Sequence, residues 1–533
     1  MSTSGSETNV GVFSAYLAGL DANLLAFFSV DFRKRDKRCC FLRLACWPGR
    51  ILAESTLLHN IPPSLSLSLS LVSTRLHPMA TAQSLKLLDV SHVSPPSGSV
   101  PETSLPLTFF DLFWIGLPPI QRLFFYELDT TTTTHFVNLQ LPKIKHSLSI
   151  SLQSFFSLAG HIRLSHSDGN HEIHYADGNS VSLTVAESEA DFHKLIQNNP
   201  KGATEVRPFL PQLPSPSLLA LQFTIFPGAG IVMGISLHHA AADGRSLAHF
   251  MKYWSCICRT GKDDNASIIQ PPFYDRTALQ EHNWLKTVIL KQMADVELEY
   301  TAKGSNNHFL RPPIPELRAT FVLSRSNVEL LRRRVLDQVE ESDKPFHCST
   351  FVLTCSYAWI CLIKSRDNTA IGDDGMDYFM FAADCRSRMD PPLSALYFGN
   401  CISICFAEAR RSDLVSDRGL LSATKALRRG IQGLDEEGLM KGIESCIPRF
   451  VEQTARRVVS VAGSPQFRVY DIDFGWGRPK KTEVTSIDTT GAIYIGDSRN
   501  EEGGSGIEFG LSLPEHEMAS FARLFQEGFQ VGS

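Results

Sequence analysis

Residues 231–244 read Ile-Val-Met-Gly-Ile-Ser-Leu-His-His-Ala-Ala-Ala-Asp-Gly, an apolar segment that stops at a pair of histidines. Apolar residues alternate from Ile231 to Leu237, which predicts a strand whose one face packs into an interior. His239 continues this alternation, so we expect its imidazole on the same face. Gly244 permits a sharp exit, and the apolar spacing that follows predicts a helix packed back onto the sheet. The chain is thus constrained to a strand, a tight turn and a helix, with a histidine at the turn.

This histidine is a candidate general base. Of the seventeen histidines, only His239 has an aspartate, Asp243, four residues later. An imidazole titrates near neutrality and can take a proton from a hydroxyl when its ring is held in one orientation. A histidine at a strand end is also common as a purely structural residue. The His-x-x-x-Asp pattern by itself leaves both alternatives open.

Composition excludes some classes of partner and site. The chain is 43% hydrophobic and 20% charged, as in ordinary globular proteins. Its 533 residues are enough to form the hydrophobic cores of two or three domains. The net charge of -5 argues against a nucleic-acid partner. Twelve cysteines show no repeated Cys-x-x-Cys pair. We therefore expect reduced thiols in a cytosolic protein, and neither a disulfide framework nor a metal site.

Residues 1–78 do not resemble part of the fold. Residues 64–71 alternate Ser and Leu, as a translated dinucleotide repeat would, and residues 11–30 are too short and too interrupted to span a membrane. We hypothesise that Met79 is the natural start and that 1–78 is a non-native or disordered extension. A transit peptide is the alternative, although the acidic residues of the segment count against it.

From Met79 onward, strand and helix patterns alternate in both halves, which predicts an α/β fold with mixed sheets. A Ser326/Glu329 capping box is expected at the head of a helix over 328–339. Pro-Gly-Ala-Gly at 227–230 predicts a hairpin. The remaining expected strands are 85–90, 124–127, 136–141, 221–226, 231–238, 319–323, 378–384 and 402–406, and the remaining helices 144–156, 282–302 and 351–363.

Residues 260–316 are irregular around one helical piece, as in a connection between compact units. We therefore expect an N-terminal domain over 79–265, a crossover linker over 266–316 and a C-terminal domain over 317–533.

His239–Gly244 and Asp473-Phe474-Gly475-Trp476-Gly477 together resemble the paired signature of one family, the plant BAHD acyltransferases, which are CoA-dependent. Four further stretches are similar to the branch of that family that acylates anthocyanins and flavonoid or phenolic glucosides: Tyr397-Phe398-Gly399-Asn400-Cys401, Leu105–Asp111, Gln121–Phe125 and Val484–Asp488. The resemblance runs in the family's order from Met79 to Gly528.

The resemblance implies a fold and a reaction. The fold would be two chloramphenicol-acetyltransferase-like domains, with mixed β-sheets flanked by helices, joined by a crossover loop. An active-site channel would run between them, with His239 midway. His239 would deprotonate an acceptor hydroxyl, which attacks the acyl-CoA thioester directly without a covalent acyl-enzyme. Acyl-CoA is then a co-substrate, and no bound cofactor is expected.

The resemblance also implies roles for other residues. Asp243 would point away from the channel toward Arg386 and fix the turn that aims His239. Thr108 is a candidate donor to the oxyanion, with a surface or capping hydroxyl as the alternative. Asn400 would orient the chain near His239, with a simple turn residue as the alternative. Asp473, Phe474, Gly475, Trp476 and Gly477 would form a structural loop on the CoA side of the channel, with plain loop packing as the alternative.

For the donor, malonyl-CoA leads and hydroxycinnamoyl-CoA follows. A malonyl carboxylate needs a cation, for which Arg245 is a candidate, although a solvent-facing residue is the better expectation. Weak candidates for the CoA phosphates are Arg478, Lys480, Lys481 and Arg332–Arg334. The acceptor would be a sugar hydroxyl of a phenolic glycoside, selected by loops such as 164–215 and 366–376. We expect a monomer without membrane or nucleic-acid partners.

Two alternatives come from other classes. A peptide-synthetase condensation domain has a similar histidine motif, but the chain has no carrier domain and the 473–477 motif favours the plant family. A non-catalytic binding protein could keep the fold, but His239 and Asp243 are both present.

Overall fold

A computed structural model describes residues 85–261, 269–302, 316–343, 346–366, 375–436, 438–454, 458–499 and 506–529. Residues 80–533 form one compact unit. The hypothesis about residues 1–78 and most of the loop 366–376 lie outside the described residues. Within the described ranges, no helix has both the length and the apolar character needed to cross a bilayer.

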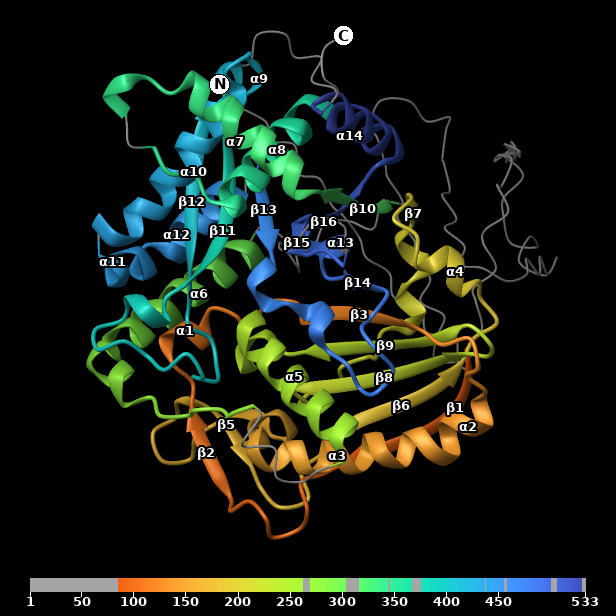
Figure 1. The fold of residues 1–533 in the computed structure, drawn as a ribbon. Helices are drawn as coiled ribbons and strands as arrows, with labels where there is room; N and C mark the ends of the chain where they lie inside the picture. Colours follow the sequence, from red (N-terminus) through yellow and green to blue (C-terminus); the bar gives the residue numbers. More distant parts are fainter. Residues whose placement is uncertain are drawn as a thin grey trace, which may run out of the picture. The chain divides into compact units, whose positions relative to one another are not determined.

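A six-stranded sheet holds the apolar segment that precedes His239 (Figure 1). It contains one parallel pair, β6 with β8, among antiparallel pairs, so the sheet is mixed. In order across the sheet its strands are β1 (Lys86–Val93), β6 (Val181–Glu187), β8 (Leu219–Phe226), β9 (Gly230–Leu237), β3 (Ile120–Glu127) and β14 (Lys481–Val484).

A seven-stranded sheet is also mixed, because β13 pairs in parallel with both β11 and β15. The prediction of an α/β fold with mixed sheets is therefore confirmed. Its strands in order are β12 (Ile402–Arg410), β11 (Met376–Asp384), β13 (Val458–Ala462), β15 (Ile493–Asp497), β16 (Ile507–Leu513), β10 (Leu317–Leu323) and β7 (Lys201–Gly202). A third, three-stranded sheet consists of β2 (Thr103–Pro106), β5 (His171–Tyr175) and β4 (His161–Leu164).

Helices cover the two large sheets, and α3 and α5 run across the face formed by β6, β8 and β9 (Figure 1). The described helices are α1 (Phe109–Leu112), α2 (Thr133–His135), α3 (Leu141–Ser154), α4 (Phe192–Leu195), α5 (Gly244–Thr260), α6 (Trp284–Ala302), α7 (Arg325–Gln338), α8 (Thr350–Ser365), α9 (Arg411–Val415), α10 (Gly419–Glu436), α11 (Leu439–Glu444), α12 (Cys446–Thr454), α13 (Ile487–Thr490) and α14 (Glu515–Glu527).

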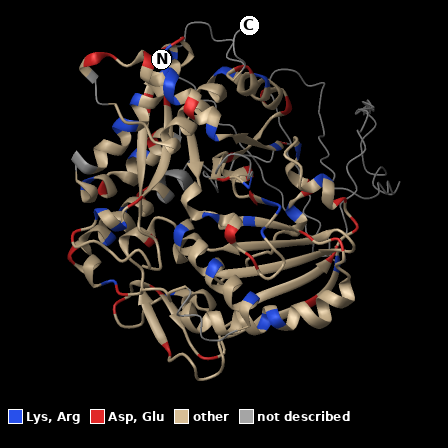
Figure 2. Ribbon diagram, in the orientation of Figure 1, with Lys and Arg blue, Asp and Glu red and all other residues tan. Residues whose placement is uncertain are grey.

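The strands β8 and β9 are buried along their whole length and carry no charged residue (Figure 2). On one face, Phe223 of β8 contacts Trp254 of α5. On the other face, Phe209 packs against Phe226 and Val232. A strand covered on both faces needs no polar alternation, which explains the nearly continuous apolar sequence before His239.

The expected hairpin is confirmed as β8 and β9, and the expected charge-free helix as α8. Two expectations are wrong. Residues 136–141 are not a strand: Phe136–Gln140 is a π-helical turn that leads into α3. Phe136 and Leu141 are both buried, and the five-residue spacing between them is that of a π turn. The cap of α7 is Ser324, which accepts from the Asn327 N–H, and not Ser326.

Each large sheet receives a strand from the other half of the chain. β14 follows the 473–477 motif but pairs with β3 in the six-stranded sheet. β7 belongs to the first half but pairs with β10 in the seven-stranded sheet. Contiguous halves are therefore not separate sheets, and the limits expected at 265 and 317 stay predictions.

A buried ionic cluster joins these exchanged strands. Glu483 of β14 forms an ion pair with Arg318 of β10 at 3.0 Å and accepts a hydrogen bond from Lys201 of β7 at 3.1 Å. Arg318 also pairs with Asp488 at 2.7 Å. Both acids lie in or beside the 484–488 motif, so that motif connects the two sheets.

Replacing Trp254 tests how far α5 depends on its buried face. Its indole is fully buried and donates to Ser147 Oγ at 3.1 Å, so Trp254→Ala should lower the free energy of unfolding by about 3–5 kcal/mol. The matched control is Trp284→Ala, because Trp284 is 47% exposed and should matter by about 0.5 kcal/mol or less. Urea denaturation measures both; equal losses would contradict this packing.

Candidate active site

His239 lies on a single 3₁₀ turn, His239–Ala241, that follows the end of β9 at Leu237. The strand alternation therefore does not extend to His239, and the face of the sheet on which its ring lies stays a prediction. The turn is capped by the neighbouring His238, whose Nδ1 accepts from the Ala240 N–H at 3.2 Å.

The imidazole of His239 stacks on the indole of Trp114. The ring centroids are 3.8 Å apart and the planes differ by 9°. Burial lowers the pKa of His239 to about 4, against smaller opposing effects of its own backbone, Asp243 and Asn400. At neutral pH the ring is therefore uncharged and able to accept a proton.

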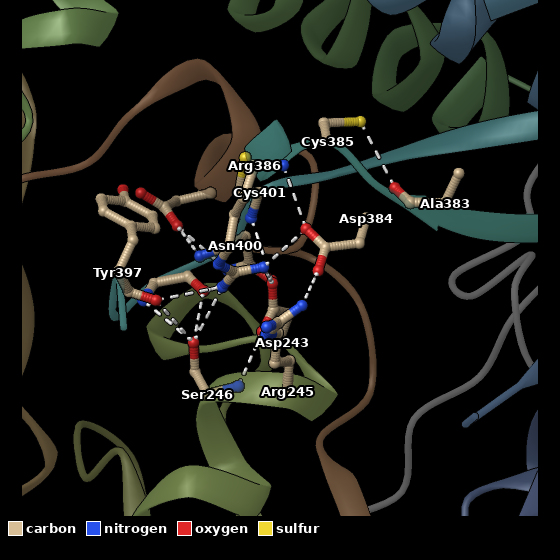
Figure 3. Close-up of polar contacts among 12 residues, drawn as sticks. Asp243, Arg245, Ser246, Ala383, Asp384, Cys385, Arg386, Tyr397, Asn400 and Cys401 are labelled. Atoms are coloured by element: carbon tan, nitrogen blue, oxygen red, sulfur yellow. Dashed lines mark hydrogen bonds and ion pairs between the residues drawn. The ribbon is translucent and has the colours of Figure 1, made fainter. Parts of the chain in front are cut away.

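Asp243 caps α5 and binds the segment that contains the YFGNC motif (Figure 3). Its Oδ1 accepts from the Ser246 N–H at 2.9 Å, and its Oδ2 accepts from the Cys401 N–H at 3.2 Å and from Arg386 at 2.9 Å. The two charged side chains are 1% and 3% exposed. The Asp243–Arg386 contact that the resemblance implied is present. Within the described residues, no hydrogen bond joins Asp243 to the ring of His239.

Arg386 lies between two carboxylates (Figure 3). Besides Asp243 it contacts Asp384 Oδ1 at 3.1 Å and donates to the Tyr397 carbonyl at 3.1 Å. Burial by itself would lower the pKa of Arg386, but the charge of Asp243 raises it above the ordinary value. Arg245, the candidate cation for a malonyl carboxylate, is paired with Asp384 at 2.7 Å.

Asn400 is fully buried and lies next to the backbone of His239, the candidate general base. Its Nδ2 donates to the His239 carbonyl at 2.9 Å and to Asp111 Oδ1 at 3.0 Å. The preceding Gly399 has a φ of +144°, which favours glycine, and this conformation turns the chain beneath the histidine. Asn400 thus contacts the backbone of His239, as expected of a residue that orients the chain there.

Thr108 is the N-cap of α1 and is buried. Its hydroxyl donates to Asp111 Oδ2 at 2.7 Å, and its N–H donates to the same oxygen at 2.8 Å. The single hydroxyl proton is therefore used by Asp111, which matches the capping alternative. A role for Thr108 as oxyanion donor stays a prediction.

The 473–477 loop lies away from these residues. Asp473 Oδ1 accepts from the N–H groups of Gly475 and Gly477, whose φ angles are +98° and +82°. Trp476 donates to Gln140 at 3.2 Å and contacts Tyr126. Phe474 packs on Trp254, and Asp473 lies 3.7 Å from Arg259.

Arg259 is in the last turn of α5, about 22 Å along the helix from its first residue, Gly244. The loop is therefore packed as a structural element near the far end of α5. Its expected place on the CoA side stays a prediction.

Most basic residues considered for the CoA phosphates have partners within the protein. Lys480 contacts Glu127, Arg478 contacts Asp471, Lys481 contacts Glu483, Arg332 contacts Glu329, and Arg334 donates to the Gly528 carbonyl. In the described part of the chain, His, Cys, Asp and Glu do not gather in groups of three that could hold a metal ion.

The structure thus joins His239, Asp243, Arg386, Asn400 and Thr108 in one connected network. Asp111 and Trp114, which complete it, were not predicted. Both lie in or just after the Leu105–Asp111 motif, and the buried carboxylate in Phe-Phe-Asp was the available signal.

Breaking the Asp243–Arg386 pair should affect stability first. Asp243→Ala leaves a buried guanidinium with one carboxylate fewer, so we expect a loss of about 3–5 kcal/mol in the free energy of unfolding. Chemical denaturation of Asp243→Ala beside Arg523→Ala, an exposed arginine paired on α14, checks this. Unchanged stability combined with complete loss of turnover would contradict a structural role.

Comparison with known proteins places the chain. Residues 90–527 match the Transferase family. Phenolic glucoside malonyltransferase 1 of Arabidopsis thaliana is 37% identical, over 84% of this chain and 98% of its own length. A coumaroyl-CoA:anthocyanidin 3-O-glucoside-6''-O-coumaroyltransferase of the same plant is 34% identical, over 85% of this chain and 99% of its own length.

The crystal structure of vinorine synthase is similar in fold, with a TM-score of 0.63 at 21% identity over 82% of this chain and 96% of that one. The predicted fold class, with chloramphenicol-acetyltransferase-like architecture, is confirmed at this level. The chain therefore belongs to the Transferase family, as a member of the BAHD acyltransferases.

Proposed function

We propose that this acyltransferase moves a malonyl group from malonyl-CoA to a sugar hydroxyl of a phenolic, flavonoid or anthocyanin glucoside. The observation that carries the proposal is the neutral imidazole of His239, stacked on Trp114 with its backbone held by Asn400. The 37% identity to a phenolic glucoside malonyltransferase supports the donor and the acceptor class.

In the proposed reaction, His239 takes the proton of the acceptor hydroxyl as that oxygen attacks the thioester carbonyl. The tetrahedral intermediate collapses with cleavage of the carbon–sulfur bond. The imidazolium returns its proton to the CoA thiolate, which restores the neutral base and releases free CoA. No covalent acyl-enzyme is formed.

General-base assistance of this kind contributes about 10² to 10⁴-fold in rate. Holding donor and acceptor in line contributes about 7–11 kcal/mol, so the expected channel matters at least as much as the base. Asp243 and Arg386 act on neither substrate in this scheme. They fix the turn between β9 and α5 that carries His239.

The second candidate donor is hydroxycinnamoyl-CoA. The 34% identity to a coumaroyltransferase supports it nearly as well. The pairing of Arg245 with Asp384 also leaves the malonyl carboxylate without an assigned cation.

Release of free CoA tests the donor. The full chain is given a panel of phenolic and flavonoid glucosides with either malonyl-CoA or p-coumaroyl-CoA, and thiol release and acylated product are followed. We expect turnover with malonyl-CoA, and loss of about 10² to 10⁴-fold in His239→Ala because the base is gone. The matched control is His193→Ala, an exposed histidine on α4 outside the site, which should keep full turnover.

Turnover only with p-coumaroyl-CoA would overturn the malonyl assignment. Full activity in His239→Ala would overturn the mechanism. No product with either donor, from protein shown to be folded, would contradict the proposed donor and acceptor classes.

On acidification, activity should fall only at an unusually low pH. Because burial holds the pKa of His239 to about 4, below the ordinary value of about 6.5, the base stays neutral until the pH approaches 4. We expect kcat/KM for the glucoside to be flat from about pH 8 to about pH 5 and to fall below that. Recovery of activity on return to pH 7 separates titration from unfolding. A fall in kcat/KM already near pH 6.5 would contradict the role of a buried, neutral His239 as the general base.

A further inference from the structure

Asp111 is a fully buried carboxylate in contact with the segment beneath His239. Its Oδ2 accepts from the N–H and hydroxyl of Thr108, and its Oδ1 accepts from the N–H of Asn400 at 2.9 Å and from the side-chain amide at 3.0 Å. The guanidinium of Arg276 is 3.5 Å away. On the next residue, Asp243 accepts from the Cys401 N–H. Two buried carboxylates thus bind neighbouring amides of one segment.

Asp111 determines which way the Asn400 side chain faces. An ionised carboxylate only accepts hydrogen bonds, so the amide NH₂ of Asn400 must point toward it. The reversed amide would bring two acceptor oxygens together. The same NH₂ group donates to the His239 carbonyl, which another oxygen could not do. The Oδ1 atom of Asn400 is therefore directed to the remaining side.

Two buried atoms of these residues are unpaired among the described residues. Nδ1 of His239 and Oδ1 of Asn400 have no hydrogen-bond partner among the described residues. Burial lowers the pKa of His239, whereas its own backbone, Asp243 and the Asn400 side chain raise it. A hydrogen bond from Nδ1–H to Oδ1 would satisfy both atoms and leave Nε2 with a free lone pair.

We infer that Asp111 is a positioning residue for acyl transfer: by orienting the Asn400 amide, it selects the Nδ1–H tautomer of His239 and leaves Nε2 as the proton acceptor. This inference rests on the proposed role of His239 as general base. A neutral histidine in the other tautomer would present an N–H to the acceptor hydroxyl and could not take its proton.

The test uses Asp111→Asn, which keeps the size but adds an NH₂ that lets the Asn400 amide reverse. The matched control is Asp377→Asn. Asp377 is equally buried and accepts from Arg411 at 2.9 Å through both oxygens, but it lies on β11 and contacts none of the site residues named above. Asn400→Ala is a second variant that removes the acceptor while leaving Asp111 with Thr108 and Arg276.

The first readout is the tautomer of His239, from ¹⁵N NMR of histidine-labelled protein, assigned by difference from His239→Ala. We expect the Nδ1–H form in the wild type and in Asp377→Asn, and its loss in Asp111→Asn and Asn400→Ala. This readout needs no substrate, so it stands even if the proposed donor and acceptor prove wrong.

The second readout is the division between kcat and KM. Asp111→Asn should lower kcat at least about tenfold, within the range that a general base contributes, with both KM values within about threefold. Asp377→Asn should lose stability but keep kcat per folded molecule. An unchanged tautomer and kcat in Asp111→Asn or Asn400→Ala, with loss of stability alone, would overturn the inference.

Discussion

The ion pair between Asp243 and Arg386 is the contact on which the geometry of the site depends. It joins the turn after β9 to the segment after β11, and both side chains are almost completely buried. A buried pair of this kind costs much desolvation and is a poor source of net stability. The ion pair instead holds the geometry of the site, because separating the two side chains would leave a buried charge without a partner. The 399–401 segment, and with it Asn400, is thereby fixed beneath His239.

Much of this fold follows from short-range sequence patterns. The amphipathic α5 follows a helical period, whereas the hairpin of β8 and β9 and the charge-free α8 are recognised from the length of their apolar segments and from the turn residues that flank the hairpin. The expected strand at 136–141 failed because a π turn gives apolar residues a spacing that period-two and period-3.6 templates both miss. Boundaries such as the cap of α7 differ by two residues, which hydrogen-bond competition among neighbouring serines decides.

Only those site residues that belong to recognisable sequence motifs could be predicted. His239 and Asp243 lie four residues apart in one motif, and Arg386 and Asn400 came from a family resemblance. Asp111 and Trp114 needed tertiary structure, because they approach His239 from more than a hundred residues away. The family resemblance made Thr108 a candidate oxyanion donor, and in the structure its hydroxyl donates to the carboxylate of Asp111, three residues later. Long-range pairing of this kind leaves no periodic signal in a single sequence.

The exchanged strands also constrain how the chain is made. During synthesis the six-stranded sheet must wait for residue 484 before its β3 edge can be covered, although five of its strands have already emerged by residue 237. An uncovered edge is a template for pairing with other chains. Nascent chains on neighbouring ribosomes could pair through this edge, and a chaperone that shields β3 would suppress such aggregation. A premature stop anywhere between β9 and β14 would leave the β3 edge without its partner strand.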